Sequence, residues 1–171
     1  MAGSPAERLA RALLDEGIPV FVGLDGAAVG HLPNELDARA LSARPLFIDG
    51  ADPESQLAGP WLMTLGRDAE RIGRAASLAA VHPTLCVFWC AETDEAAMVR
   101  HLRRLNLVRL PSGEAVHLRH ADPRVMSIVA MSLRGENATR LFGPARTLIM
   151  WGEALGSIVT VSLSTEASID G

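Results

Sequence analysis

Residues 84–91 read TLCVFWCA, and this run decides the fold class. Apolar side chains stand at both its odd and its even positions, which is typical of a central strand covered on both faces of a sheet. We therefore expect a sheet with structure packed on both sides of this strand. The only two cysteines, Cys86 and Cys90, are too few for a disulfide framework and are expected to be reduced core thiols.

Helix and strand patterns alternate before this run. Ser4 and Glu7 form a capping box around Pro5, and apolar residues then recur at helical spacing until Gly17, which predicts a first helix. The later expected elements are a strand over 18–24, a short helix around 35–42, a strand over 45–50, a strand over 61–65 and a helix over 67–80.

The same alternation continues after the run. Thr93 is expected to cap a helix whose last turn carries Arg103 and Arg104. A Pro-Ser-Gly-Glu turn between two short strand patterns predicts a β-hairpin near residues 107–119. The remaining expected elements are a helix that begins at Asp122 and Pro123, a short helix that ends at Phe142, Gly143 and Pro144, and closing strands over 147–151 and 157–163.

The expected fold class is α/β or α+β, as a single layered domain with a mixed β-sheet and helices packed on it. The chain has 171 residues, 49% apolar and 21% charged, which is enough for one sizeable core. We expect one domain over residues 1–171, with its core over 18–151. The sequence has neither a signal-peptide pattern nor a long uncharged apolar run, so we expect a cytoplasmic protein with no membrane partner.

The composition excludes several kinds of catalysis. All sixteen basic residues are arginine and tyrosine is absent, so the chain offers no lysine Schiff base and no phenolic acid or base. It lacks a Gly-x-Ser-x-Gly elbow, and Gly23, Gly26 and Gly30 match no dinucleotide fingerprint. Asp25, directly before a glycine, is interpreted as a turn residue rather than a general acid or base. We therefore expect no catalytic residue and no cofactor.

Two groups of side chains carry metal donors: His82, Cys86 and Cys90, and His117, His120 and Asp122. The first group would align only on a helix, whereas Pro83 and the apolar run after it favour a strand. The second would make a two-His, one-carboxylate set. Neither has the spacing of a structural zinc site, so we expect no metal and ordinary surface histidines. A metal-dependent hydrolase remains an open alternative.

The densest polar feature is a set of six arginines: Arg100, Arg103, Arg104, Arg109, Arg119 and Arg124. One interpretation is structural: a solvated face in which Asp122 caps a helix and Arg119 or Arg124 bonds a carboxylate. The other is a patch of planar cations for an acidic partner. Nucleic acid is disfavoured, because the net charge is −4 and four phenylalanines and three tryptophans leave few rings for base stacking.

Several segments of the chain occur in the order and spacing of one family signature. They are FVGLDGA at 21–27, PLF at 45–47, LAGPWL at 57–62, HLRRL at 101–105, VRLPSG at 108–113, LRHADPRV at 118–125 and FGP at 142–144. Together they resemble the type VI secretion effector chaperones, the Tap/Tec adaptor proteins, first described as a bacterial domain of unknown function. The resemblance covers residues 19–151. It departs at His120 and Ala121, where the family usually has two aromatic residues.

The resemblance implies a non-enzymatic adaptor that binds a toxic effector protein in the cytoplasm and helps load it onto the VgrG spike protein. We expect the effector to bind in an apolar groove bordered by arginines. The partner-binding candidates are Arg100, Arg103, Arg104, Arg119 and Arg124. The residues expected to support the fold are Asp25, Trp61, Asp122, Pro123 and Gly143. An arginine-patch module for an acidic ligand or nucleic acid is the main alternative.

Overall fold

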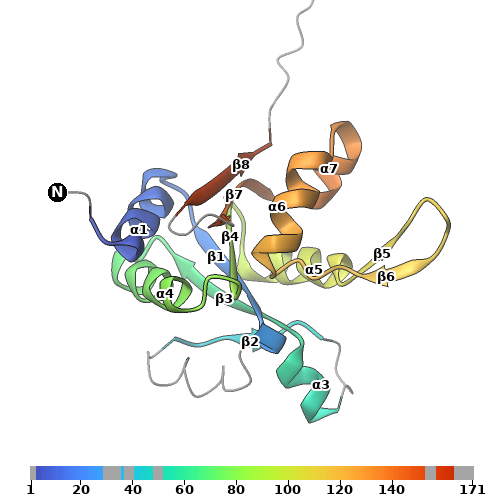
Figure 1. The fold of residues 1–171 in the computed structure, drawn as a ribbon, viewed down its shortest axis with the longest axis horizontal. Coiled ribbons are helices and arrows are strands. Elements are labelled where there is room, and N and C mark those ends of the chain that lie inside the picture. Colours follow the sequence, from blue (N-terminus) through green and yellow to red (C-terminus); the bar gives the residue numbers. More distant parts are fainter. Residues whose placement is uncertain (1–2, 29–35, 37–40, 48–51, 153–156, 164–171) are drawn as a thin grey trace, which may run out of the picture.

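The computed structural model describes residues 3–28, 36, 41–47, 52–152 and 157–163, which form a sheet with helices on both faces (Figure 1). The helices of one face are α1 (Pro5–Asp15) and α4 (Ala69–Val81), and those of the other are α5 (Glu95–Leu105), α6 (Pro123–Ser132) and α7 (Gly135–Phe142). Two short elements, η1 (Gly26–Ala28) and α3 (Pro53–Ala58), contact each other beyond the end of β1. The layered fold class is confirmed. None of the described helices is long and apolar enough to cross a membrane.

The sheet has six strands in the order β2 (Arg44–Pro45), β3 (Pro60–Gly66), β1 (Val20–Asp25), β4 (Cys86–Ala91), β7 (Ala145–Trp151) and β8 (Ile158–Ser162). Every neighbouring pair is antiparallel, so the expectation of parallel pairs within a mixed sheet is corrected. Strands β3 and β4 do run in the same direction and are joined by α4, as in a parallel unit. Strand β1 lies between them and is antiparallel to both, which splits that unit.

Strand β4 lies at the centre of the core, as its sequence predicted. All six of its residues are buried. Cys86, Phe88 and Cys90 belong to the core under α1 and α4, whereas Val87, Trp89 and Ala91 belong to the core under α5, α6 and α7. Both cysteines are free thiols, and burial raises the pKa of Cys90 to about 12. They are therefore unreactive core residues.

Local signals placed the starts of α1 and α6 correctly. Ser4 and Glu7 form both halves of the capping box of α1. The hairpin is also confirmed, with strands β5 (Leu107–Arg109) and β6 (Ala115–His117). The N-cap of α5 is Asp94 and not Thr93, because the Asp94 carboxylate accepts a hydrogen bond from the backbone N–H of Ala97 at 2.6 Å.

Two regions differ from the sequence-based expectation. Helix α3 was not predicted, although Asp52 and Pro53 begin it with the same Asp-Pro pair that begins α6. The helix expected around 35–42 falls largely outside the described residues, as does the end of the strand expected over 45–50. Within 41–47, only Arg44 and Pro45 belong to a strand.

Gly23 in β1 makes room for the indole ring of Trp89 on the neighbouring strand. A Cβ atom at Gly23 would lie 3.3 Å from Nε1 of Trp89 and 3.7 Å from Cβ of Ala121. We expect Gly23→Val to lower the free energy of unfolding by about 1–3 kcal/mol, because the added methyl groups overpack this site. Urea unfolding measures the loss.

The control for this variant is Gly73→Ala in α4. A Cβ atom at Gly73 meets nothing within 4 Å outside its own helix, so this change should raise the free energy of unfolding by about 0.5–1 kcal/mol through helix propensity. A Gly23→Val protein as stable as the wild type would contradict the packing assigned to Trp89.

Candidate functional site

Two of the candidate arginines form an ion-pair network with two aspartates. Arg119 donates to Oδ2 of Asp25 from Nε at 3.0 Å and from Nη2 at 2.5 Å. Its Nη2 also lies 3.5 Å from Oδ2 of Asp122. Arg124 donates to Asp122 from Nε at 3.0 Å and from Nη2 at 2.8 Å. The network therefore joins the end of β1, the segment after the hairpin and the start of α6.

The carboxylates of this network are buried, and its guanidinium groups reach solvent. The side chains of Asp25 and Asp122 are 8% and 2% exposed, whereas those of Arg119 and Arg124 are 49% and 56% exposed. A buried carboxylate is costly unless it is paired and hydrogen-bonded. Arg119 and Arg124 therefore neutralise the two aspartates and support the fold, and only their outer edges face solvent.

Asp122 is also the N-cap of α6, as the sequence indicated. Its Oδ1 accepts a hydrogen bond from the backbone N–H of Arg124 at 2.9 Å, and Pro123 occupies the first turn. Burial by itself raises the pKa of Asp122, but the hydrogen bonds from Arg124 and the nearby guanidinium charges outweigh it. The pKa of Asp122 therefore lies below its ordinary value.

Asp25 has a second structural contact besides its ion pair. Its Oδ1 accepts a hydrogen bond from the backbone N–H of Ala27 at 3.0 Å, in line with the turn interpretation of the Asp-Gly pair. The bond to Arg119 was not predicted, because the two residues are 94 positions apart in the chain.

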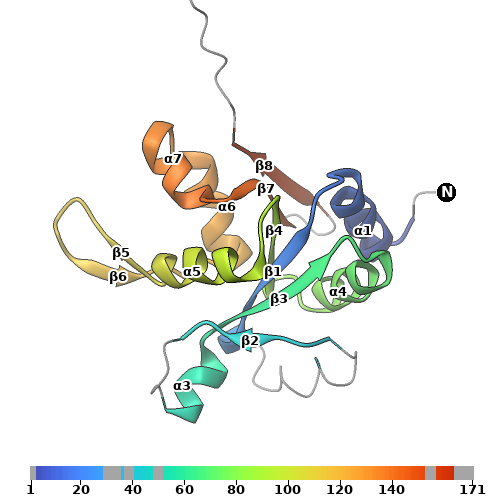
Figure 2. The ribbon, with the colours of Figure 1, turned by 180° about the vertical axis from the view of Figure 1, so that it is seen from behind.

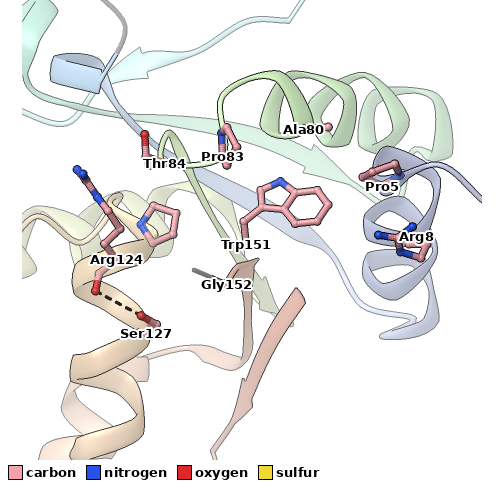
Figure 3. Close-up of a pocket in the computed structure, with 10 residues that line it drawn as sticks. Pro5, Arg8, Ala80, Pro83, Thr84, Arg124, Ser127, Trp151 and Gly152 are labelled. Atoms are coloured by element: carbon pink, nitrogen blue, oxygen red, sulfur yellow. Dashed lines mark hydrogen bonds between the residues drawn. The ribbon is translucent and has the colours of Figure 1, made fainter. Parts of the chain in front are cut away.

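A cavity of about 630 Å³ lies beside Arg124 (Figure 3). Its lining residues come from α1, from the end of α4 and the segment after it, from α6, and from the end of β7 and the residue after it: Pro5, Arg8, Ala80, Pro83, Thr84, Pro123, Arg124, Ser127, Trp151 and Gly152. The charged residues in this lining, Arg8 and Arg124, are both cationic. Arg8 and Trp151 were not predicted as site residues, because nothing local in the sequence links the two ends of the chain.

A smaller cavity of about 230 Å³ lies beside Arg119. Its lining draws on four of the segments that carry the family resemblance. They contribute Asp25 and Ala27 from 21–27, Phe47 from 45–47, Ala58, Gly59 and Pro60 from 57–62, and Leu118, Arg119 and Ala121 from 118–125. Segments distant in the sequence thus meet on one side of the ion-pair network.

The other three partner-binding candidates lie on α5. Arg100 and Arg104 are exposed, and Arg103 is half-buried. Within the described part of the chain, no ion pair joins any of these three arginines to a carboxylate. Nε of Arg103 is buried and has no hydrogen-bond partner there. The structure therefore divides the five partner-binding candidates into a neutralised pair, Arg119 and Arg124, and a cationic group on α5.

Apolar side chains directly follow this cationic group. The β5–β6 hairpin extends from the end of α5 away from the sheet (Figure 2). On it, Leu107 is 55% exposed and Leu110 is 42% exposed. We define the α5–hairpin surface by five residues: Arg100, Arg103, Arg104, Leu107 and Leu110. Arginine is enriched at protein–protein interfaces, and exposed apolar side chains add contact area there.

His120 is a core residue, which corrects its interpretation as a surface histidine. It is fully buried, and its Nε2 lies 2.8 Å from Oδ1 of Asn106. Its ring is edge-on to that of Trp89, with 6.5 Å between ring centroids. Burial lowers the pKa of His120 to about 4, with a smaller contribution from His101. His120 is therefore a neutral hydrogen-bonding group inside the core.

The two remaining structural candidates lie at strand and helix ends. Trp61 in β3 is partly buried and packs against the core under α1 and α4. Gly143 ends α7 with a φ of 54°, a conformation that favours glycine. A Cβ atom there would also overlap the ring of His101, whose Nε2 lies 2.9 Å from the carbonyl oxygen of Leu141.

The geometry does not assemble the proposed two-His, one-carboxylate set. In the described residues, no group of three His, Cys, Asp or Glu side chains is placed to hold a metal ion. Nε2 of His120 is paired with Asn106, and the carboxylate of Asp122 is occupied by arginine. His117 is exposed, and its Nδ1 lies 3.0 Å from the carbonyl oxygen of Asn106.

Replacing Asp122 should cost more than replacing an aspartate that only caps a helix. We expect Asp122→Ala to lower the free energy of unfolding by about 2–3 kcal/mol, because it removes the cap of α6 and the charged hydrogen bonds of Arg124. Asp94→Ala is the matched control: Asp94 caps α5 through Ala97 alone, and its loss should cost about 1 kcal/mol. Equal losses in urea unfolding would show that the ion pair adds nothing.

Acid should destabilise the protein through His120. Its pKa is about 4 in the folded state and about 6.5 in the unfolded state, so between these values the unfolded state binds more protons. The folded state should lose up to about 3 kcal/mol over this window. His101, whose pKa burial also lowers, acts in the same direction. His120→Phe should lose less on acidification, measured by urea unfolding at several pH values; an unchanged pH dependence would contradict this assignment.

Comparison with known families identifies the chain. One family model matches residues 20–140, which is more than two thirds of the 171 residues, and its description is Domain of unknown function (DUF4123). The match includes Asp25, α5, the hairpin and α6, whereas β7 and β8 lie beyond it. Searches of curated proteins and of solved structures gave no significant match. Because the family model covers most of its length, this chain belongs to the DUF4123 family.

Proposed function

We propose that this protein is a cytoplasmic adaptor that binds a type VI secretion effector and helps load it onto the VgrG spike. Membership of the DUF4123 family supports this proposal, together with the resemblance of the motif segments to those of the effector chaperones. The adaptor acts by binding and catalyses no reaction. We infer that the polar residues of the adaptor either support its fold or contact the partner protein.

The observation that carries the proposal is the α5–hairpin surface. Its three arginines have no carboxylate partner in the described residues, although Arg119 and Arg124 nearby in sequence are both neutralised. A group of like charges on one helix is unfavourable for that helix alone. Acidic groups of a partner would relieve this repulsion, and Leu107 and Leu110 would contribute apolar contact area.

The layout of the surface suits a partner protein better than a small molecule. The hairpin projects from the sheet as a ribbon, so a partner can contact both the ribbon and α5 (Figures 1 and 2). A standard interface buries about 800 Å² on each partner, which a helix and an adjacent hairpin can supply. Guanidinium groups form bidentate pairs with carboxylates, which would orient the effector as well as attract it.

The arginine-patch module for an acidic ligand or nucleic acid remains the second candidate. The same unpaired arginines favour it, but the exposed apolar side chains beside them are leucines, which do not stack on bases. The metal-dependent hydrolase is not proposed further, because His117, His120 and Asp122 each have other partners.

The test reverses charge on α5. We expect Arg103→Glu and Arg104→Glu to weaken binding of the effector encoded beside this gene by about tenfold or more, because each replaces an attractive pair by repulsion. Isothermal titration with purified proteins measures the affinity. Arg11→Glu is the control, because Arg11 is an exposed helical arginine on the opposite face of the sheet. It should leave binding unchanged.

Three outcomes would count against the proposal. Unchanged affinity in both α5 variants would remove this surface from the binding site. Absence of any binding to the neighbouring effector would refute the adaptor function. Steeply salt-dependent binding to an RNA or DNA oligonucleotide, lost in the same variants, would favour the nucleic-acid alternative.

A further inference from the structure

The strand β8 forms an edge of the sheet that is open in the described residues. It pairs with β7, and no other strand described here pairs with it. Strand β8 also lies beyond the part of the chain that the family model matches. The α5–hairpin surface does not include it.

The register shows which backbone groups of β8 are free to bind. The backbone N–H of Leu163 donates to Arg146, and the carbonyl of Ser157 accepts from Gly152, so odd-numbered residues point their backbone groups at β7. From Ile158 to Ser162, β8 pairs with β7 without a register shift. Because these groups alternate along an antiparallel strand, those of Ile158, Thr160 and Ser162 point away from β7. A further strand could pair with them.

Edges of natural sheets are usually protected against pairing by charges, prolines, bulges or very short strands. The opposite edge follows this rule, because β2 has two residues and one of them is Pro45. Strand β8 does not follow it: its sequence, Ile-Val-Thr-Val-Ser, has no charge and no proline and favours β structure. Such an edge is suited to accept another strand.

A groove runs beside this edge. Its volume is about 790 Å³, and it lies between the end of α6, α7 and residues 161–163. Met131 and Phe142 line it on the helical side, and Val161 and Leu163 line it on the strand side. A strand added beside β8 would place every second side chain on this face, next to the groove. The edge would bind the main chain and the groove would bind alternate apolar side chains.

The charge of the groove indicates what kind of segment it binds. Arg134 is its one charged lining residue in the described part of the chain. A complementary segment therefore carries an acidic residue. A second copy of β8 supplies none, because residues 158–162 are uncharged. This argues for a different polypeptide as the occupant.

We propose that β8 and the adjoining groove bind an extended segment of a partner protein by strand addition, the segment having alternating apolar residues and an acidic end. The identity of that partner, as effector or spike, rests on the proposed function. Helix α5 bonds to β2 and β3 through Glu95, whereas α6 packs on β4, β7 and β8. The α5–hairpin surface and the β8 edge share no residue, so each can be tested separately.

The test uses a labelled synthetic peptide, EVTVTVE, as the probe. Fluorescence polarisation measures its affinity for the wild-type chain and for Thr160→Pro and Thr160→Ala. Thr160→Pro removes an outward N–H and leaves the β7-facing groups in place, and Thr160→Ala is its matched control. We expect the proline variant to bind at least about tenfold more weakly than the alanine variant. Two forms of EVTVTVE, methylated on the valine nitrogens or on the threonine nitrogens, block opposite edges of the bound strand. One of them should bind the wild type at least about tenfold more weakly, and KVTVTVK should bind it several-fold more weakly.

Each outcome supports or overturns the proposal. No saturable binding of EVTVTVE to the wild type, or equal binding by the unmethylated peptide and both methylated forms, overturns it. If Thr160→Pro fails to fold, the methylated peptides decide, because that comparison uses the wild-type chain. A concentration-dependent dimer that Thr160→Pro abolishes would assign the edge to a second copy and overturn the acidic-partner assignment, as would tighter binding of KVTVTVK. Arg103→Glu should leave peptide binding unchanged, so failure of effector binding alone would refute only the proposed function.

Discussion

The buried carboxylate of Asp122 is the group on which the second half of the structure depends. It caps α6, accepts two hydrogen bonds from the side chain of Arg124 and lies near Arg119, which in turn bonds Asp25 at the end of β1. A carboxylate this deeply buried is tolerated only with such partners. The start of α6 is thereby tied to the central sheet, and α6 then covers β4, β7 and β8.

This network also explains why the arginines differ in role. Two guanidinium groups compensate two buried carboxylates through Nε and Nη2, so this side of each group is not available to an acidic partner. The arginines of α5 form no ion pair with any described carboxylate. The distinction is electrostatic: in our proposal the arginines of α5 bind the partner, whereas Arg119 and Arg124 support the structure. The adaptor that we propose needs both, because a rigid scaffold holds the binding surface in a defined shape.

The apolar interior gives the same scaffold two independent cores. Strand β4 sends alternate side chains to each face, so the helices of the two layers pack on different sets of its residues. One face contains Phe88 and both cysteines. The other contains Trp89, and the rings of His101 and His120 each lie edge-on to its indole. These histidines remain neutral because burial disfavours their charged form, which makes this face sensitive to acid.

The local structure was predictable from residue patterns: the apolar strand at 86–91, the capping box at Ser4, the hairpin, and the Asp-Pro start of α6. These patterns are formed by residues a few positions apart, so they can be recognised directly. The strand order, the burial of His120 and the pairing of Arg119 with Asp25 emerge only in the folded chain. Each of these depends on segments far apart in the chain, and no local pattern specifies which distant strand or charge a residue will meet.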